Sequence, residues 1–196
     1  MSEVTVEHRP AGSTLRSVLV VLAVAVVTVG GFWWLNRPAP GGGGNSVTAI
    51  EVPGAGVAPT IGQQAPDFTA TTIDGRAVRL SELRGRPVWL TFGASWCAPC
   101  RVEAPDIQRA YAAGLGNVEV ISVYLGEDAA AAQSFAGSLG LTYAHVPDPE
   151  RKLAAAWGVN GIPVHWFVDA DGVVREHEVG ILGPQRIREL VEPLAH

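Results

Sequence analysis

Cysteine is scarce in this chain, which has only two among its 196 residues. Two thiols cannot form a framework of several disulfides, and two cysteine ligands cannot close a four-ligand zinc site. Basic residues are also in deficit, because 14 Lys and Arg against 19 Asp and Glu give a net charge of −5. The chain therefore lacks the basic footprint of a protein that binds nucleic acid. No stretch of the sequence recurs elsewhere in it, so there is no sign of a repeat architecture.

Both cysteines lie in the segment Trp96-Cys97-Ala98-Pro99-Cys100, directly after a short apolar run. Such a pair can close into a small disulfide ring and open again with little movement of the fold. One thiolate attacks a substrate disulfide to give a mixed disulfide, and the second thiol resolves it. A passive structural disulfide is the alternative, but closing so short a loop removes little chain entropy. The pair therefore predicts thiol–disulfide exchange, with no metal and no other cofactor.

The first sixty residues predict a membrane anchor followed by a tether. Residues 17–35 form an uncharged run of about nineteen residues, long enough for a helix to cross a hydrocarbon core of ~30 Å. A cleaved signal peptide is the alternative, but the run exceeds a typical signal core and no A-x-A-like site follows it. We expect an anchor in the lipid bilayer, with residues 1–16 in the cytoplasm. Residues 36–60 are rich in Gly and Pro and predict a flexible tether, which leaves residues 61–196 as one globular domain outside the cytoplasm.

The globular part alternates strand patterns with helix patterns. The Asp74-Gly75 pair between short alternating segments predicts a β-hairpin. A helix is expected to begin at the cysteine pair and to end near Ala113, and a last helix opens at Pro184. The expected strands are residues 88–92, 118–124, 164–168 and 173–179, with a short edge strand at residues 143–146.

Three segments of this domain carry a resemblance to a known family. They are WLTFGASWCAPCRVEAP at residues 89–105, GVNGIP at residues 158–163 and FVDADG at residues 167–172. Together they resemble the membrane-anchored thioredoxin-like proteins of the TlpA/ResA type, over about residues 62–194. The resemblance implies an α/β, thioredoxin-like fold, with a central mixed four-stranded sheet flanked by helices and an N-terminal β-hairpin extension. It also implies an extracytoplasmic thiol–disulfide oxidoreductase, a class in which many members serve cytochrome c maturation.

The placement of the cysteine pair predicts a role for each residue around it. Cys97 is expected at a helix N-terminus, where free N–H groups and the helix dipole favour a thiolate. We therefore expect Cys97 to be the attacking and more exposed thiol, and Cys100, one turn further, to be the resolving thiol. Trp96 either shields the pair and offers a flat contact surface or is simply a packed aromatic. Ala98 and Pro99 set the geometry of the ring.

The resemblance adds three residues to the site. The proline that matches Pro163 is cis in the family and packs against the disulfide, and the residue before it, here Ile162, binds an incoming chain through its backbone. Seen without the family, this segment is an ordinary loop. Glu103, one helical turn from Cys100, matches an acidic residue that tunes the cysteine pair, and the alternative is a solvated glutamate. Thr91 stands where thioredoxins usually carry a buried aspartate.

Four functions stay open. The first is a reductase that passes electrons to oxidised apocytochrome c or other protein disulfides, and the resemblance implies a transmembrane electron donor of the CcdA or DsbD kind. An oxidase or isomerase of secreted proteins would use the same residues at a higher reduction potential, and a redox titration separates the two. A peroxidase is disfavoured because the P-x-x-x-T-x-x-C pattern is missing around Cys97. A copper-binding module of the Sco type would need C-x-x-x-C and a distal histidine, and we expect His145, His165 and His177 to be surface or half-buried residues instead.

Overall fold

The structure, a computed structural model, describes residues 12–35 and 47–195. The chain divides into two units, residues 1–44 and residues 45–196. The second unit contains both cysteines and every strand named below, so the candidate site is built from it alone.

The first unit contains the helix α1 (Gly12–Leu35). Among the described residues, no helix combines the length and the apolar character that crossing a membrane requires. The anchor at residues 17–35 stays a prediction. Residues 1–11 of the predicted cytoplasmic segment and residues 36–46 of the predicted tether lie outside the described residues.

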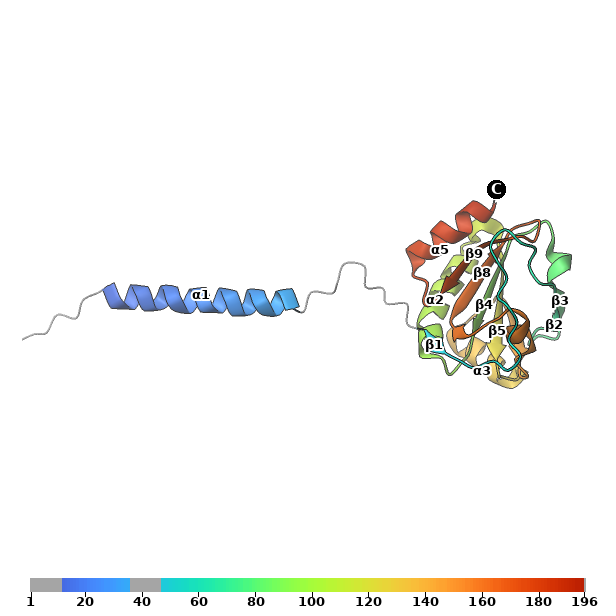
Figure 1. Ribbon diagram of the computed structural model, residues 1–196, viewed down its shortest axis with the longest axis horizontal. Helices are drawn as coiled ribbons and strands as arrows, with labels where there is room; N and C mark the ends of the chain where they lie inside the picture. Colours follow the sequence, from blue (N-terminus) through green and yellow to red (C-terminus); the bar gives the residue numbers. More distant parts are fainter. Residues whose placement is uncertain (1–11, 36–46, 196) are drawn as a thin grey trace, which may run out of the picture. The chain divides into compact units, whose positions relative to one another are not determined.

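The second unit is built on a mixed sheet of five strands (Figure 1), which are β4 (Val88–Gly93), β5 (Glu119–Leu125), β6 (Ala144–Asp148), β8 (Val164–Val168) and β9 (Val174–Val179). The strand order is β6-β5-β4-β8-β9. β5 is parallel to both β4 and β6, whereas β8 is antiparallel to both β4 and β9. The expected edge strand is present as β6, so the sheet has five strands where the resemblance implied four. β6 belongs to the sheet because it pairs with β5 along its whole length, with Val146 opposite Val123 and both residues buried.

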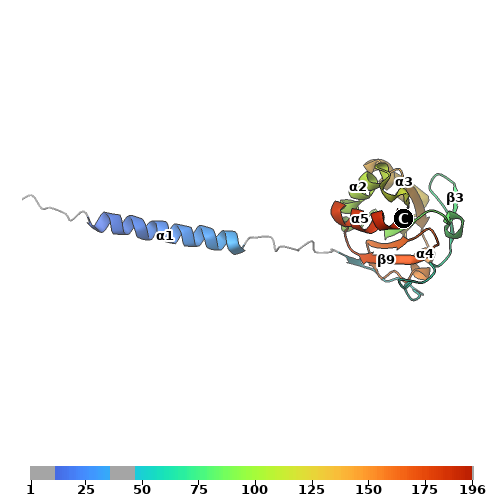
Figure 2. The same ribbon diagram turned by 90° about the horizontal axis from the view of Figure 1, so that it is seen from above.

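Helices cover both faces of this sheet: α2 (Ala98–Ala112), α3 (Ala129–Leu139), α4 (Lys152–Ala156) and α5 (Pro184–Val191), with the short 3₁₀ helices η1 (Leu80–Leu83), η2 (Leu115–Asn117) and η3 (Glu192–Ala195). Successive side chains of a strand point to opposite faces. Leu90 and Phe92 of β4 enter a core with Trp157, the residue after α4, whereas Trp89 enters a second core with residues of α2, α3 and α5. Figure 2 shows α2 and α3 on one side of the domain and α4 on the other. The predicted α/β architecture, a sheet flanked by helices, is confirmed.

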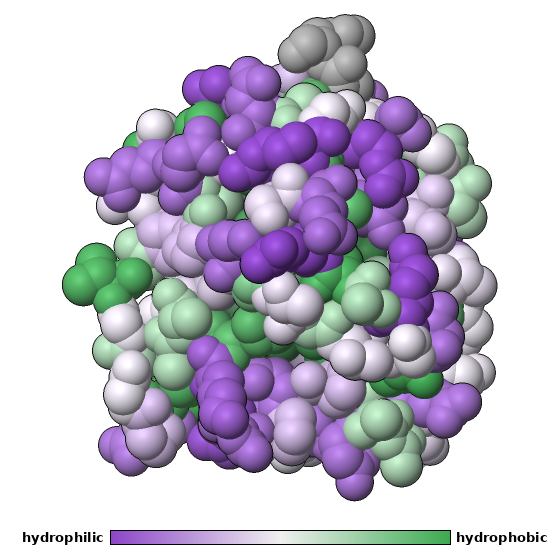
Figure 3. Space-filling view, turned by 90° about the vertical axis from the view of Figure 1, so that its right-hand side faces the viewer, coloured by the Kyte–Doolittle hydropathy of each residue, from purple (hydrophilic) through white to green (hydrophobic). Residues whose placement is uncertain are grey.

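The predicted N-terminal hairpin is also confirmed. Strand β2 (Thr69–Thr71) pairs antiparallel with β3 (Ala77–Arg79). The turn between them contains Gly75 with a φ of 81°, a conformation that glycine adopts without strain. The residues that the hairpin region buries against the core are Phe68, Val78 and Leu80. Figure 3 shows the face of the domain that bears the hairpin, where apolar side chains lie among hydrophilic ones.

The second half of the predicted tether, residues 47–60, packs on the domain instead of hanging free. Strand β1 (Thr48–Ala49) pairs antiparallel with β7 (Gly161–Ile162). Further along, the N–H of Gly56 donates a hydrogen bond of 2.8 Å to the carbonyl of Ala155. The predicted tether is therefore too long, because this stretch finds backbone partners on the surface of the domain.

Two of the three histidines expected near the surface are buried. His145 is 3% exposed and His165 is completely buried, whereas His177 is half-buried. His145 lies on β6 and His165 on β8, strands whose residues are buried on both faces of the sheet. The expectation was therefore wrong for His145 and His165, because helices or loops cover both sides of these strands.

Burial of His145 predicts a loss of stability in mild acid. Burial lowers the pKa of this ring from 6.5 to about 4, and the Tyr124 hydroxyl lies 2.8 Å from its Nδ1. Because the folded pKa is below the unfolded one, this stabilisation is complete above about pH 6.5 and is lost as the pH falls toward 4. We expect the free energy of unfolding, measured with urea, to fall by about 1.5 kcal/mol between about pH 6.5 and about pH 5.

The control for this prediction is His145→Asn, whose side chain does not titrate. Its free energy of unfolding should vary less with pH over the same range. A small slope should remain, because burial also lowers the pKa of His177. Equal pH slopes in the two proteins would show that His145 does not carry the effect.

Candidate active site

The cysteine pair lies where β4 leads into α2. Cys97 and Cys100 form a disulfide with a Cα–Cα distance of 5.3 Å. Cys97 is the N-cap of α2, and its Sγ accepts a hydrogen bond of 3.2 Å from the N–H of Cys100. Pro99 occupies the first turn, where the missing N–H has no helical partner to lose. A Cβ at Gly93 would lie only 3.3 Å from the Cys100 sulfur, so the absence of a side chain at this position lets the disulfide pack closely against β4.

An acidic residue in the loop after β5 holds the loop before Cys97. The N–H of Ser95 donates a hydrogen bond of 2.8 Å to Glu127, and the Ser95 hydroxyl donates a second one to the same carboxylate. From the other side, the Arg101 guanidinium donates to the Ser95 carbonyl at 3.2 Å. Sequence reasoning missed Glu127, although it lies three residues after the strand expected at residues 118–124 and parallel strands end at one edge of the sheet.

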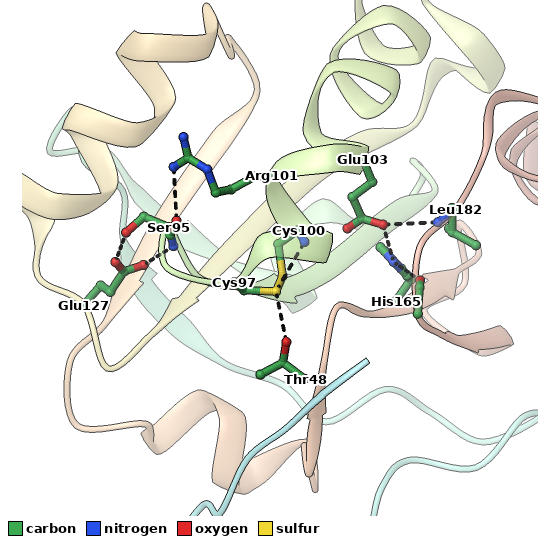
Figure 4. The surroundings of a disulfide bond; sticks show 10 residues. Thr48, Ser95, Cys97, Cys100, Arg101, Glu103, Glu127, His165 and Leu182 are labelled. Atoms are coloured by element: carbon green, nitrogen blue, oxygen red, sulfur yellow. Dashed lines mark hydrogen bonds and ion pairs between the residues drawn. A yellow bond between two sulfur atoms is a disulfide. The ribbon is translucent and has the colours of Figure 1, made fainter. Parts of the chain in front are cut away.

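Pro163 follows Ile162, which pairs with Thr48 of β1, and the peptide bond between Ile162 and Pro163 is cis. The cis bond implied by the resemblance is therefore confirmed. Ile162 belongs to β7 and is completely buried. The partner of β7 is β1, and the Thr48 hydroxyl of that strand lies 4.0 Å from the Cys97 Sγ (Figure 4). Sequence analysis did not find Thr48, because it falls in the predicted tether.

The exposure of the two cysteines differs from the expectation. Cys97 is only 1% exposed and Cys100 is 7% exposed. The prediction that Cys97 is the more exposed thiol is therefore wrong for this conformation. The physical reason is that β1 lies over the pair and places Thr48 against the sulfur of Cys97.

Trp96 presents its side chain at the surface next to the buried pair. It is 50% exposed, so of its two expected roles the exposed contact surface fits better than the packed aromatic. Ala98 is also exposed, and Pro99 is half-buried. The surface at the pair is therefore formed by its neighbours and not by the sulfur atoms.

Glu103 is buried below the pair and does not face solvent. It is 2% exposed, and its Oε2 accepts a hydrogen bond of 3.2 Å from the N–H of Leu182. The Nε2 of His165 lies 3.3 Å from the same oxygen. Figure 4 shows the carboxylate pointing toward both residues. The alternative of a solvated helix glutamate is therefore wrong.

The hydrogen bonds of His165 define which ring nitrogen carries the hydrogen. The indole N–H of Trp89 lies 3.3 Å from Nδ1 of His165, and an indole N–H can only donate. Nδ1 is therefore the acceptor, and the neutral ring carries its hydrogen on Nε2. That N–H is directed at Glu103 and at the carbonyl of Gly180, which lies 3.2 Å away. Glu103 thus has two N–H groups pointing at one oxygen.

Cys100 and Glu103 also border one small cavity of about 20 Å³. A cavity of this size has room for one water molecule if polar groups line it. Thr91, Ser122 and Tyr124 supply polar atoms to the same lining, and Thr91 and Ser122 lie opposite each other on β4 and β5. A proton that leaves Cys100 therefore has two candidate acceptors, a water molecule in this cavity and the Glu103 carboxylate.

The part of the chain that the structure describes contains no group of three His, Cys, Asp or Glu side chains arranged to hold a metal ion. The groups that the structure places at the cysteine pair are two sulfur atoms, one buried carboxylate and the backbone around them. A disulfide at a helix N-terminus, with a buried acid one helical turn away, can exchange with a second disulfide.

Comparison with known proteins gives the same chemistry. Residues 61–177 match the AhpC/TSA family. The thiol–disulfide oxidoreductase ResA of Geobacillus thermodenitrificans is 32% identical over 135 residues, which are 68% of this chain and 78% of the relative. A secreted disulfide oxidoreductase of Mycobacterium tuberculosis, described as homologous to DsbE of E. coli, has a TM-score of 0.60 at 28% identity, covering 65% of this chain and 96% of that one.

An exposed lipoprotein thioredoxin of Streptococcus pneumoniae has a similar fold. It aligns with a TM-score of 0.56 at 29% identity, over 66% of this chain and all of the other. The fold, the cysteine pair and the matched relatives agree with one another. The chain therefore belongs to the AhpC/TSA family, as a thioredoxin-like thiol–disulfide oxidoreductase of the ResA type.

Proposed function

We propose that this oxidoreductase works as a reductase of protein disulfides. The thiolate of Cys97 attacks one sulfur of the substrate disulfide, which forms a mixed disulfide and releases one substrate thiolate. The thiol of Cys100 then loses its proton and attacks the sulfur of Cys97. This step releases the second substrate thiolate and closes the Cys97–Cys100 disulfide. Two electrons pass from the cysteine pair to the substrate, and the two released thiolates take up protons.

The observation that carries this direction is the burial of Glu103 beside the pair. A negative charge in a buried site disfavours a second negative charge nearby, so it disfavours the thiolate forms that exist only when the pair is reduced. Destabilising the reduced form lowers the reduction potential and makes the pair a better electron donor. The N-cap position of Cys97 acts in the opposite sense, because the helix terminus stabilises a thiolate there. We infer that the buried carboxylate has the larger effect. Once β1 moves away from Cys97, solvent screens the interaction between the helix terminus and the thiolate, whereas Glu103 stays buried.

The reduction potential tests this direction. Equilibration of the full chain with mixtures of reduced and oxidised glutathione or dithiothreitol, followed by alkylation, gives the potential of the pair. We expect a value closer to that of thioredoxin, about −270 mV, than to that of the oxidase DsbA, about −120 mV. A value near −120 mV would overturn the reductase and would assign the oxidase or isomerase reaction to the same residues.

The location and the partners are part of the proposal. We infer that the domain works outside the cytoplasm, held in a lipid bilayer through residues 17–35. The support is the uncharged run of that segment and the two similar proteins described as secreted and as an exposed lipoprotein. A reductase in an oxidising space needs a supply of electrons, because that space provides no thiols of its own. A transmembrane dithiol carrier of the CcdA or DsbD kind would provide them, and apocytochrome c is a candidate substrate.

A further inference from the structure

The segment Val47–Val52, here called the covering segment, lies over the active site. Its Thr48 pairs with Ile162 and its Ala49 with Gly161, in an antiparallel arrangement. The N–H of Ile50 continues the pairing with a hydrogen bond of 3.1 Å to the carbonyl of Asn160. The covering segment therefore forms a strand along the residues that lead into the cis-proline.

The fit between the covering segment and the domain is close. A Cβ added at Gly161 would lie 2.8 Å from Cγ1 of Val47, so the glycine leaves the room that this valine occupies. Val52, at the end of the segment, is 9% exposed and joins the core with Trp157. The guanidinium of Arg151 donates a hydrogen bond of 3.0 Å to the carbonyl of Glu51. Backbone, side-chain and polar contacts all hold this segment in place.

The position of Thr48 has a chemical meaning. An extended chain binds a sheet edge by backbone pairing, and its alternate side chains then point toward the domain. In the covering segment the side chain that points at the attacking sulfur is Thr48, whose hydroxyl lies 4.0 Å from the Cys97 Sγ. A mixed disulfide requires two sulfur atoms at about 2.05 Å. A cysteine at position 48 would therefore need only a short movement to reach Cys97.

We propose that the covering segment is an internal pseudosubstrate. It occupies the strand-pairing site of the protein substrate and puts Thr48, which cannot form a disulfide, in the position of the substrate cysteine. This inference rests on the proposed function and adds the form of the substrate to it. The substrate is an extended protein segment with its cysteine opposite Ile162, and it has to displace the covering segment before Cys97 can attack.

A cross-linking experiment tests the position of Thr48. The full chain carries Thr48→Cys together with Cys100→Ser, and the matched control carries Ala49→Cys together with Cys100→Ser. Oxidised glutathione, a small disulfide, is attacked by Cys97, and one glutathione leaves. The introduced thiol then attacks the Cys97 sulfur and releases the second glutathione. Two protein thiols are oxidised, one glutathione disulfide is reduced, and the two glutathione thiolates take up the protons.

We expect the variant at position 48 to form the internal disulfide at least about tenfold more completely than the control, because the effective concentration is high only for a side chain that faces Cys97. Mass spectrometry of the linked peptides measures this ratio. In guanidinium chloride the two variants should behave alike, since adjacent positions close nearly equal loops. Equal cross-linking of the two variants in the native chain would overturn the proposal.

The rate of alkylation of Cys97 in the reduced full chain tests whether the covering segment restricts access to this thiol. Ile50→Pro removes the donor that binds Asn160 and should detach the segment, whereas Val57→Pro changes a residue that is 91% exposed in the neighbouring stretch. We expect about a tenfold faster reaction for Ile50→Pro, equivalent to about 1.4 kcal/mol of lost pairing, and no change for Val57→Pro. An unchanged rate in Ile50→Pro would show that the segment does not restrict Cys97.

These tests separate the inference from the proposed function, because neither depends on turnover. If the unaltered chain reduces insulin but positions 48 and 49 cross-link equally, the pseudosubstrate is wrong and the reductase stands. If the unaltered chain does not reduce insulin while only position 48 cross-links, the reductase is wrong and the covering of Cys97 stands.

Discussion

Replacing Cys97 by Ser should lower the rate of insulin disulfide reduction to that of dithiothreitol alone. Cys97 is the N-cap of α2, and its sulfur accepts the N–H of Cys100 at 3.2 Å. The helix terminus therefore stabilises a thiolate at this position, and a serine hydroxyl at the same place cannot form a mixed disulfide. The turbidity of precipitating insulin chains measures the rate, and circular dichroism should show an unchanged fold.

The matching change at Cys100 should have a different result. Cys100→Ser leaves the attacking thiol intact but removes the resolving thiol, so the protein should accumulate as a mixed disulfide with its substrate. A band that disappears on reduction, identified by mass spectrometry as linked through Cys97, would be the evidence. The double variant Cys97→Ser with Cys100→Ser is the control and should form no adduct. A stable adduct through Cys100 in the Cys97→Ser variant would reverse the two roles, and turnover by Cys97→Ser would show that Cys97 is not required.

The sequence predicted the parts of this site that depend on local signals. The apolar runs at residues 88–92, 118–124 and 164–168 became β4, β5 and β8, because a strand buried on both faces leaves a continuous apolar run. The helix expected to begin at the cysteine pair, from the alternation of strand and helix patterns, is α2. These signals lie within a few residues of the chemistry that they predict.

The contacts that cover and support the pair could not be predicted in the same way. Strand β1 has two residues, too few for a periodic pattern, and it lies next to Gly- and Pro-rich sequence that indicates a tether. Glu103 meets His165 only because the antiparallel pairing of β8 with β4 places His165 opposite Thr91. A histidine within a run that is buried on both faces shows no alternation to reveal which face it takes. Both contacts depend on which residues of two distant strands lie opposite each other, and a single sequence does not show this pairing.

The charge of Glu103 leads to the second large effect. Glu103→Gln removes a buried negative charge beside the pair and keeps the shape of the side chain and an acceptor for the N–H of Leu182. A thiolate should then form more easily, so the pH midpoint of thiol alkylation in the reduced protein should fall by about one to two pH units. The reduced form gains the same free energy, which raises the reduction potential by about 30 to 60 mV. Alkylation across pH and a redox titration measure the two quantities.

Two further variants distinguish charge from packing. Glu103→Asp keeps the carboxylate. Its alkylation midpoint should therefore stay close to that of the unaltered protein, whereas the midpoint of Glu103→Gln should move further away. A loss of stability from the shorter side chain does not change this expectation. Glu82→Gln removes a negative charge from an exposed residue of η1 and should change neither the midpoint nor the potential. If Gln and Asp at position 103 shift both quantities equally, then shape and not charge sets them. If neither shifts them, Glu103 does not act on the pair, and water in the cavity lined by Thr91 is left as the acceptor of the Cys100 proton.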